Sequence, residues 1–319
     1  MSTQNELKLF AGPGNPALAE SVASWLQVPV GKMLYTQFPD GENYVRFEES
    51  VRGADVYFLQ PTCPPVDTNL VVLLEAMDAL RRASAWRITP VIPYYGYARQ
   101  DKKDAPREPI TAKLIADILT VAGANRVMCL DLHADAIQGF FNIPVDHLTA
   151  IHLFIDYFAS KLASGLEDVV IVSPDEGRVK KVRQVVQALK KPLAVGYKHH
   201  PTHGETEVTH LAGDVRGKTP IIIEDMITSG GSILQAVDAL LAHGCKPEIY
   251  VAATHGVFAR DAVERLCSRP EIAEIVITDS IPFPPEKRHP KIKTLSVASL
   301  FGEAIHRATN DLSITSLFD

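Results

Sequence analysis

Short apolar runs alternate with amphipathic helical patterns along the whole chain, and this alternation limits the folds that the sequence can adopt. Apolar runs rich in β-branched residues have the length and composition of buried strands; they are residues 56–60, 88–92, 126–130, 169–172, 220–223, 249–252 and 275–277. Apolar residues spaced three and four apart predict helices around 73–80, 115–122 and 233–240. Gly123 and Gly244 stand where two of these helices should end. Such an order predicts an α/β fold, in which a mostly parallel sheet has helices on both faces.

A weak internal repeat indicates two similar halves. Met77–Leu80 and Val237–Leu240 share the letters Asp-Ala-Leu, lie about 160 residues apart, and are each followed by a predicted strand. The length of 319 residues also suits two domains of ordinary size. We therefore expect an N-terminal domain over residues 1–150 and a C-terminal domain over 151–305, with residues 306–319 packing back on the first.

The composition excludes several classes of protein. The net charge of −6 argues against a basic surface for nucleic acid, so an anionic ligand must be held by local positive charge and backbone dipoles. No stretch approaches the roughly 20 apolar residues of a membrane span, and no targeting signal is visible. The four cysteines are scattered, which is typical of a reduced, cytoplasmic protein and not of a disulfide frame or a zinc site.

The most informative segment is 220–232, which reads PIIIEDMITSGGS. Small residues let the backbone wrap closely around a ligand, and N–H groups at a helix start bind phosphate. Paired acids before such a loop suit the vicinal hydroxyls of a ribose. We expect a ribose 5-phosphate clamp made of Glu224, Asp225, Thr228, Ser229, Gly230, Gly231 and Ser232. The alternative is a strand-to-helix turn with a hydroxyl cap and solvated acids.

This segment resembles the phosphoribosyl-diphosphate loop of type I phosphoribosyltransferases. Other segments narrow the resemblance to the ribose-phosphate diphosphokinases; they are residues 38–42, 93–103, 107–113, 131–134, 137–141 and 173–175. The resemblance runs from about residue 8 to the C-terminus. It implies two phosphoribosyltransferase-like domains, the first on the ATP side and the second on the ribose 5-phosphate side. The implied reaction is Mg²⁺-dependent transfer of the β,γ-diphosphoryl group of ATP to the 1-hydroxyl of ribose 5-phosphate, which gives 5-phosphoribosyl 1-diphosphate and AMP.

The resemblance also assigns roles to single residues. It places ATP at Phe38, Asp40, Glu42, Arg99 and Gln100. The charge of Arg99, Lys102, Lys103 and Arg107 suits a triphosphate, although a solvated loop is the plainer reading of such a charge run. In the family the hairpin that carries the first three of these residues reaches into a neighbouring subunit, and the assembly is a homo-oligomer built from dimers, often a hexamer.

Two further residues resemble the Mg²⁺-linked positions of the family, His133 and Asp175. Asp175 offers the oxygen that a hard cation prefers, whereas imidazole is a poor ligand for Mg²⁺. Each also has a plainer reading: a hydrogen-bonded histidine at a strand end, and an N-cap for the following helix. Both readings of Asp175 can hold together.

The catalytic pair implied by the resemblance is Lys198 and His200, in a segment, 197–204, that we expect to be an exposed mobile loop. The family has an arginine where this chain has His200, and a neutral imidazole cannot replace a bidentate guanidinium. Two more departures are Thr228, in place of a third acid, and Arg178, where many members have glycine.

A second, regulatory nucleotide site between subunits is common in the family. The matching residues are Arg52, Arg107, Gln138, Ser313 and Thr315. Asp135 stands where many members have serine, and a carboxylate beside a bound diphosphate is repulsive. We therefore expect weakened inhibition through that site.

Two other functions remain open at the sequence level. A phosphoribosyltransferase would use the same loop, but the second α/β half and the basic cluster near Arg99 argue against it. A catalytically weak regulatory homologue is compatible with His200 and Thr228, whereas Lys198, His133 and Asp175 argue for an active enzyme.

Overall fold

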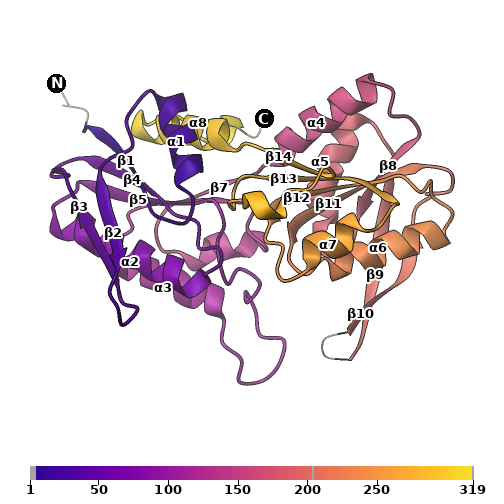
Figure 1. The fold of residues 1–319 in the computed structure, drawn as a ribbon, viewed down its shortest axis with the longest axis horizontal. Helices are drawn as coiled ribbons and strands as arrows, with labels where there is room; N and C mark the ends of the chain where they lie inside the picture. The colour runs from indigo at the N-terminus through magenta and orange to yellow at the C-terminus, as the bar shows by residue number, and fades with distance from the viewer. Residues whose placement is uncertain (1–4, 203–204, 318–319) are drawn as a thin grey trace. The chain divides into compact units, whose positions relative to one another are not determined.

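The computed structural model describes residues 5–202 and 205–317, and of residues 197–202, 205–210 and 316 it describes the backbone alone. The chain divides into two compact units (Figure 1). Unit 1 holds the chain up to Thr149, the short segment Ser280–Pro282 and the residues from Ser296 on, and unit 2 holds the remainder. The C-terminal segment that packs with the first unit thus begins at Ser296, before residue 306.

Unit 1 is built on one parallel sheet with helices on both faces. Its elements are β1 (Leu7–Ala11), α1 (Pro16–Leu26), β2 (Met33–Gln37), β3 (Asn43–Phe47), β4 (Asp55–Leu59), α2 (Val66–Arg82), β5 (Arg87–Ile92), α3 (Thr111–Ala122), β6 (Val127–Leu130), η1 (Asp135–Phe140), β7 (Val145–Leu148), α8 (Ala298–Thr309) and η4 (Thr315–Leu317). The sheet has the order β1-β4-β5-β6-β7. Helices α2 and α3 cover one face, and α1 and α8 cover the other (Figure 1). The antiparallel pair β2-β3 forms a small sheet of its own.

Unit 2 repeats this plan with a larger sheet. Its elements are α4 (Ile151–Ala163), β8 (Val169–Ser173), η2 (Glu176–Arg178), α5 (Val179–Leu189), β9 (Leu193–Thr202), β10 (Glu205–Ala212), β11 (Thr219–Ile227), α6 (Gly231–Ala242), β12 (Ile249–Gly256), α7 (Ala262–Cys267), β13 (Ile272–Thr278), η3 (Pro285–Lys287) and β14 (Ile292–Leu295). The strand order is β10-β9-β8-β11-β12-β13-β14, in which β10 pairs antiparallel with β9 and the other described pairs are parallel.

The two sheets have the same order of strands. Taken along the chain, β1, β4, β5, β6 and β7 occupy the positions that β8, β11, β12, β13 and β14 occupy in unit 2. A hairpin follows the helix after the first of these five strands, α1 in unit 1 and α5 in unit 2, but β9 joins the sheet through β8, whereas β2-β3 does not join its sheet. The predicted α/β class, with mostly parallel sheets flanked by helices, is confirmed.

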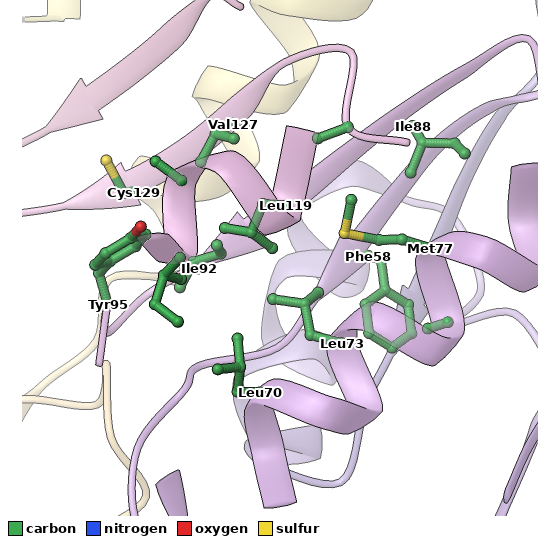
Figure 2. Packing of buried hydrophobic residues seen from close by; sticks show 14 of the residues in the cluster. Phe58, Leu70, Leu73, Met77, Ile88, Ile92, Tyr95, Leu119, Val127 and Cys129 are labelled. Atoms are coloured by element: carbon green, nitrogen blue, oxygen red, sulfur yellow. The ribbon is translucent and has the colours of Figure 1, made fainter. Parts of the chain in front are cut away.

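The core of unit 1 lies between the sheet and the pair α2 and α3 (Figure 2). Leu73 and Met77 of α2 are fully buried, and Phe58 of β4 and Ile92 of β5 belong to the same cluster. Each fully buried side chain of this kind contributes roughly 1.5–3 kcal/mol. An equivalent cluster in unit 2 joins α6 and α7 to β11 and β12. The helical spacing at 73–80 and 233–240 therefore identified the apolar faces that hold the helices on their sheets.

Some predicted boundaries need correction. β11 continues to Ile227, so Glu224 and Asp225 lie inside the strand and not after it. The segment 197–204 was expected to be a loop, but the backbone of its residues up to Thr202 belongs to β9 and pairs with β10. The strand was not predicted because the segment is polar and lacks an apolar pattern. The main-chain hydrogen bonds between paired strands do not depend on such a pattern. In the described part of the chain, no helix is both long and apolar enough to cross a bilayer.

Candidate active-site residues

The acid pair lies near the carboxyl end of a central strand of unit 2. β11 is flanked by β8 and β12, and Glu224 and Asp225 are its sixth and seventh residues. The Asp225 N–H donates to Glu224 Oε1 at 3.0 Å, and the Met226 N–H donates to Asp225 Oδ1 at 2.8 Å. Backbone donors therefore orient both carboxylates before any ligand binds. Open α/β sheets bind their ligands at this end of the strands.

Burial and the repulsion between the two carboxylates make it costly for both acids to carry a charge. The pKa of Glu224 is raised well above its ordinary value, first because the carboxyl is buried and then because the charge of Asp225 is adjacent. Arg178 opposes the rise: its Nε lies 3.3 Å from Glu224 Oε1, and its Nη2 lies 2.6 Å from Asp225 Oδ2. The sequence had marked Arg178 only as a departure from the family. Its contact with the acids could have been anticipated only from the pairing of β8 with β11.

The loop 228–232 joins the acid pair to α6. Gly230 has a φ of 76°, which favours glycine, and a Cβ there would lie 3.0 Å from the side chain of Leu266, which would have to shift. The carbonyl of Thr228 accepts from the Ala259 N–H at 2.9 Å, and the carbonyl of Ser229 accepts from Arg265 Nη1 at 3.3 Å. The carbonyls of Thr228 and Ser229 are thus held, and the 12-residue helix α6 begins within this segment, at Gly231. N–H groups at a helix start can bind a phosphate, and the phosphate contact of this loop stays a prediction.

Asp175 follows β8, the strand next to β11. It is the N-cap of η2, and its Oδ1 accepts from the Arg178 N–H at 3.2 Å. The Ser173 hydroxyl donates to the Asp175 carbonyl at 2.7 Å, which fixes the turn. The capping role expected as the plainer reading of Asp175 is therefore present, although it caps a short 3-10 turn ahead of α5. A half-buried carboxylate in this position can also serve a hard cation.

In unit 1, the predicted ATP residues Arg99 and Gln100 are exposed and follow β5. The Gln100 N–H donates to the Tyr97 carbonyl at 2.9 Å, and the Thr111 hydroxyl lies 2.5 Å from Gln100 Oε1. These contacts tie the turn to the start of α3. Lys102 lies 3.4 Å from Asp104 in an exposed pair, which has little energetic weight. The basic cluster is therefore a solvated surface that is anchored at its two ends.

His133 follows β6, the strand next to β5, and is half-buried. The two residues before it, Asp131 and Leu132, are held by hydrogen bonds to Thr149, which follows β7, and to His147 of β7. The Thr149 hydroxyl donates to Asp131 Oδ1 at 2.8 Å, and the Leu132 N–H donates to His147 Nε2 at 2.9 Å. Since β5 and β6 are parallel neighbours, the Arg99 turn and His133 both lie at the carboxyl edge of this sheet.

The hairpin residues Phe38, Asp40 and Glu42 form the exposed connection between β2 and β3. The Phe38 N–H donates to the Glu42 carbonyl at 2.8 Å, and the Glu42 N–H donates to Asp40 Oδ1 at 3.2 Å. The Phe38 ring is 47% exposed, and its edge-to-face contact is with Tyr44. The tip is thus ordered by its own hydrogen bonds while its aromatic ring faces solvent.

The five residues that resemble the regulatory site do not form one cluster within a single unit. Arg52 lies ahead of β4, at the amino edge of the sheet, and is 3.5 Å from the Ser84 hydroxyl. Arg107 lies in the loop after β5, at the opposite edge, with a φ of 70°. Gln138 lies in η1, where its Nε2 donates to the Asp135 carbonyl at 2.9 Å. Ser313 and Thr315 lie beyond α8, and the Ser313 carbonyl accepts from Arg307 Nη1 at 3.0 Å.

The side chains of Lys198 and His200 lie outside the described residues. Their backbone belongs to β9, where Lys198 pairs with Val208 and the neighbouring His199 pairs with Glu207.

Comparison with known proteins gives the class and then the family. Residues 7–123 match the profile of the N-terminal domain of ribose phosphate pyrophosphokinase, and residues 199–319 match that of a phosphoribosyl synthetase-associated domain. The ribose-phosphate pyrophosphokinase of Caldanaerobacter subterraneus subsp. tengcongensis is 50% identical over 314 residues, which is 98% of each chain. That of Fusobacterium nucleatum subsp. nucleatum is 49% identical over 99% of each chain.

A solved structure agrees with these sequence matches. The crystal structure of phosphoribosylpyrophosphate synthetase from Mycobacterium smegmatis has a TM-score of 0.90 at 42% identity, and the match covers 96% of this chain and all of that one. The fold and the sequence thus define an enzyme class, the diphosphoryl-transferring kinases. The chain belongs to the ribose-phosphate pyrophosphokinase family.

Proposed function

We propose that the chain is a ribose-phosphate diphosphokinase. In the proposed reaction the 1-hydroxyl oxygen of ribose 5-phosphate forms a bond to the β-phosphorus of ATP. The bond from that phosphorus to the α,β-bridging oxygen breaks, AMP leaves with that oxygen, and the hydroxyl proton is released. The observation that carries the proposal is the acid pair beside the loop 228–232, in a chain half identical to named pyrophosphokinases over nearly its full length.

The two units offer different chemistry for the two substrates. In unit 2, Glu224 and Asp225 can accept from the sugar hydroxyls, while the loop 228–232 can donate to the 5-phosphate. In unit 1, the exposed Arg99 and Gln100 can bind the triphosphate, and the exposed ring of Phe38 can stack on a base. We assign Lys198, with His200 two residues later, to charge stabilisation on the transferred group.

Mg²⁺ is the proposed cofactor, and the donor set fits a nucleotide-bound ion. No group of three or more His, Cys, Asp or Glu among the described residues could hold an ion by protein ligands alone. Mg²⁺ usually keeps several waters and binds through one or two carboxylates plus substrate phosphates. We assign Asp175 as such a carboxylate, and we assign His133 an action through water or phosphate, since imidazole suits Mg²⁺ poorly. When bound, Mg²⁺ neutralises charge on the phosphate oxygens.

Measuring the product nucleotide tests the proposal directly. Purified full-length chain is mixed with ATP, Mg²⁺ and ribose 5-phosphate, and phosphorus NMR follows AMP and 5-phosphoribosyl 1-diphosphate. We expect the two in equal amounts, and neither without the sugar. Sugar-dependent ADP would identify an ordinary phosphoryl kinase and contradict the proposal. Absence of any sugar-dependent product would favour the regulatory homologue.

We also propose a cytoplasmic homo-oligomer built from dimers. The exposed hairpin tip at Phe38 supports this, because an aromatic ring and two carboxylates in solvent suit an inter-subunit contact. The placement of Arg52 and Arg107 at opposite edges of one sheet supports a regulatory site made by more than one copy. Light scattering at several concentrations tests the assembly, and Phe38→Ala should weaken ATP binding if the tip serves a neighbour.

A further inference from the structure

The acid pair of β11 has an arginine partner from a different element. Arg178 ends η2, begins α5 as its N-cap, and approaches both carboxylates. Its side chain is 11% exposed, and those of Glu224 and Asp225 are 7% and 4% exposed. Charges this poorly solvated interact strongly, so removing the guanidinium changes the site more than removing a surface charge does.

The guanidinium of Arg178 contacts two carboxylates whose positions in the strand would be expected to place them on opposite faces of the sheet. Glu224 and Asp225 are consecutive in β11, and consecutive side chains of a strand leave on opposite faces. Nevertheless, Nε of Arg178 lies 3.3 Å from Glu224 Oε1 and its Nη2 lies 2.6 Å from Asp225 Oδ2. The planar fork of one arginine can face two oxygens at once, which a lysine ammonium on a flexible stem cannot do with the same geometry.

The backbone of Arg178 holds the next part of the site. Its N–H donates to Asp175 Oδ1 at 3.2 Å. One residue therefore contacts Asp175 through its main chain and the acid pair through its side chain. A shift of the guanidinium would therefore move the two carboxylates that we assign to the sugar. It would not move the loop 228–232 in the same way, because that loop is held by separate hydrogen bonds from Ala259 and Arg265.

We propose that Arg178 is a positioning residue that holds Glu224 and Asp225 together as a two-carboxylate clamp for the 2- and 3-hydroxyls of the sugar. This inference rests on the proposed function. The two hydroxyls of a diol donate two hydrogen bonds. A site recognises both hydroxyls together only when its two acceptors are held at a fixed distance from each other. Arg178 thus sets the discrimination between ribose 5-phosphate and 2-deoxyribose 5-phosphate.

The test compares Arg178→Met and Arg178→Lys with the wild type and with Arg183→Met. Arg183 is exposed on the same helix, so its loss removes an equal charge without touching the acids. Calorimetry gives the Kd for each sugar phosphate, and steady-state kinetics give KM and kcat. We expect both Arg178 variants to bind ribose 5-phosphate about 10-fold or more weakly, as for a lost hydrogen bond to a charged group. Their preference over the 2-deoxy sugar should shrink, the KM for ATP should stay within about twofold, and Arg183→Met should behave as wild type.

Four outcomes overturn this inference. Wild-type discrimination in Arg178→Lys would mean that charge alone suffices. An equal loss for ribose and 2-deoxyribose 5-phosphates, or a parallel rise in the KM for ATP with a lower Tm, would indicate a structural role. Failure of the wild type to bind ribose 5-phosphate would remove both the inference and the proposed function. Binding of the sugar without formation of 5-phosphoribosyl 1-diphosphate would defeat the proposed function alone, because the Kd values would still test Arg178.

Discussion

Removing the guanidinium of Arg87 should destabilise unit 1 more than any exposed ion pair could. Arg87 and Asp55 are directly paired residues at the starts of β5 and β4. Arg87 Nε donates to Asp55 Oδ1 at 2.8 Å, and its Nη2 contacts Asp55 Oδ2, the Tyr57 hydroxyl at 3.3 Å and the Ala308 carbonyl at 3.2 Å. The arginine thus connects the sheet to the end of α8.

The magnitude follows from burial. The side chain of Asp55 is 2% exposed and that of Arg87 is 17% exposed. Leaving a buried charge without its partner costs about 3–5 kcal/mol, and we take about 3 kcal/mol because water can reach the arginine side of the pair. Such a loss is a large part of the roughly 5–15 kcal/mol that stabilises a domain. It corresponds to a fall in Tm of about 6–12 °C for a unit of this size.

The assay is thermal unfolding of Arg87→Met at fixed protein concentration and scan rate, with Arg82→Met as the matched control. Arg82 pairs with Asp78 at 2.5 Å on the exposed face of α2, and its loss should leave the Tm unchanged within error. Hydrogen exchange should also quicken in the last turn of α8 in Arg87→Met alone. Equal Tm values for the two variants, or unchanged exchange in α8, would refute the reasoning. The double variant Arg87→Met/Asp55→Leu should recover most of the loss, because no buried charge is then left unpaired.

Three further predictions concern activity. Lys198→Ala should lower kcat by about 100-fold or more with little change in the Kd of the sugar, as stopped-flow and calorimetry would show; an unchanged kcat would remove Lys198 from the mechanism. The pKa of Glu224 is raised, so as pH falls the folded chain takes up a proton at this carboxylate before the unfolded chain does. The acid pair then loses negative charge. The KM for ribose 5-phosphate should therefore increase as the pH falls through the raised pKa. In Asp225→Asn the rise should shift to lower pH, because the neighbouring charge is gone, and a coincident profile would contradict the assignment. Asp135→Ser should strengthen ADP inhibition at saturating ATP, and strong inhibition already present in the wild type would show that Asp135 does not block a second site.

The sequence was sufficient for the parts of the fold that depend on apolar spacing. The strands β4, β5, β6, β8, β11, β12 and β13 and the helices α2, α3 and α6 were anticipated, because a two-sided sheet buries continuous apolar runs and each helix buries one face. The outer elements β1, β2, β3, β7, β10 and β14 were missed, and so was β9, which lies between β10 and β8. None of these strands has the long apolar run of a strand that is buried on both faces, so local pattern does not reveal its pairing with another strand.

The candidate site shows the same limit. Glu224, Asp225 and Gly230 could be proposed as site residues because their types and spacing suggest a chemistry by themselves, and their role stays a prediction. The arginine that faces the acids could not be found, because the register of β8 against β11 brings Arg178 to them, and register is not visible in one sequence. Likewise, nothing local distinguishes Arg52, at one edge of its sheet, from Arg107 at the other.

The matching order of strands in the two units has a consequence for their history. A shared order of five strands, with a hairpin after the helix that follows the first of them, points to duplication of one ancestral gene. In unit 2 the connection from β11 to α6 consists of two hydroxyl residues and a glycine, whereas in unit 1 the equivalent connection from β4 to α2 contains Pro61, Pro64 and Pro65. Proline has no N–H to offer a phosphate. Three of the six residues in the unit 1 turn therefore have no N–H that could bind a phosphate, whereas every residue of the unit 2 turn has one, and the predicted ATP residues of unit 1, Arg99 and Gln100, follow a different strand, β5.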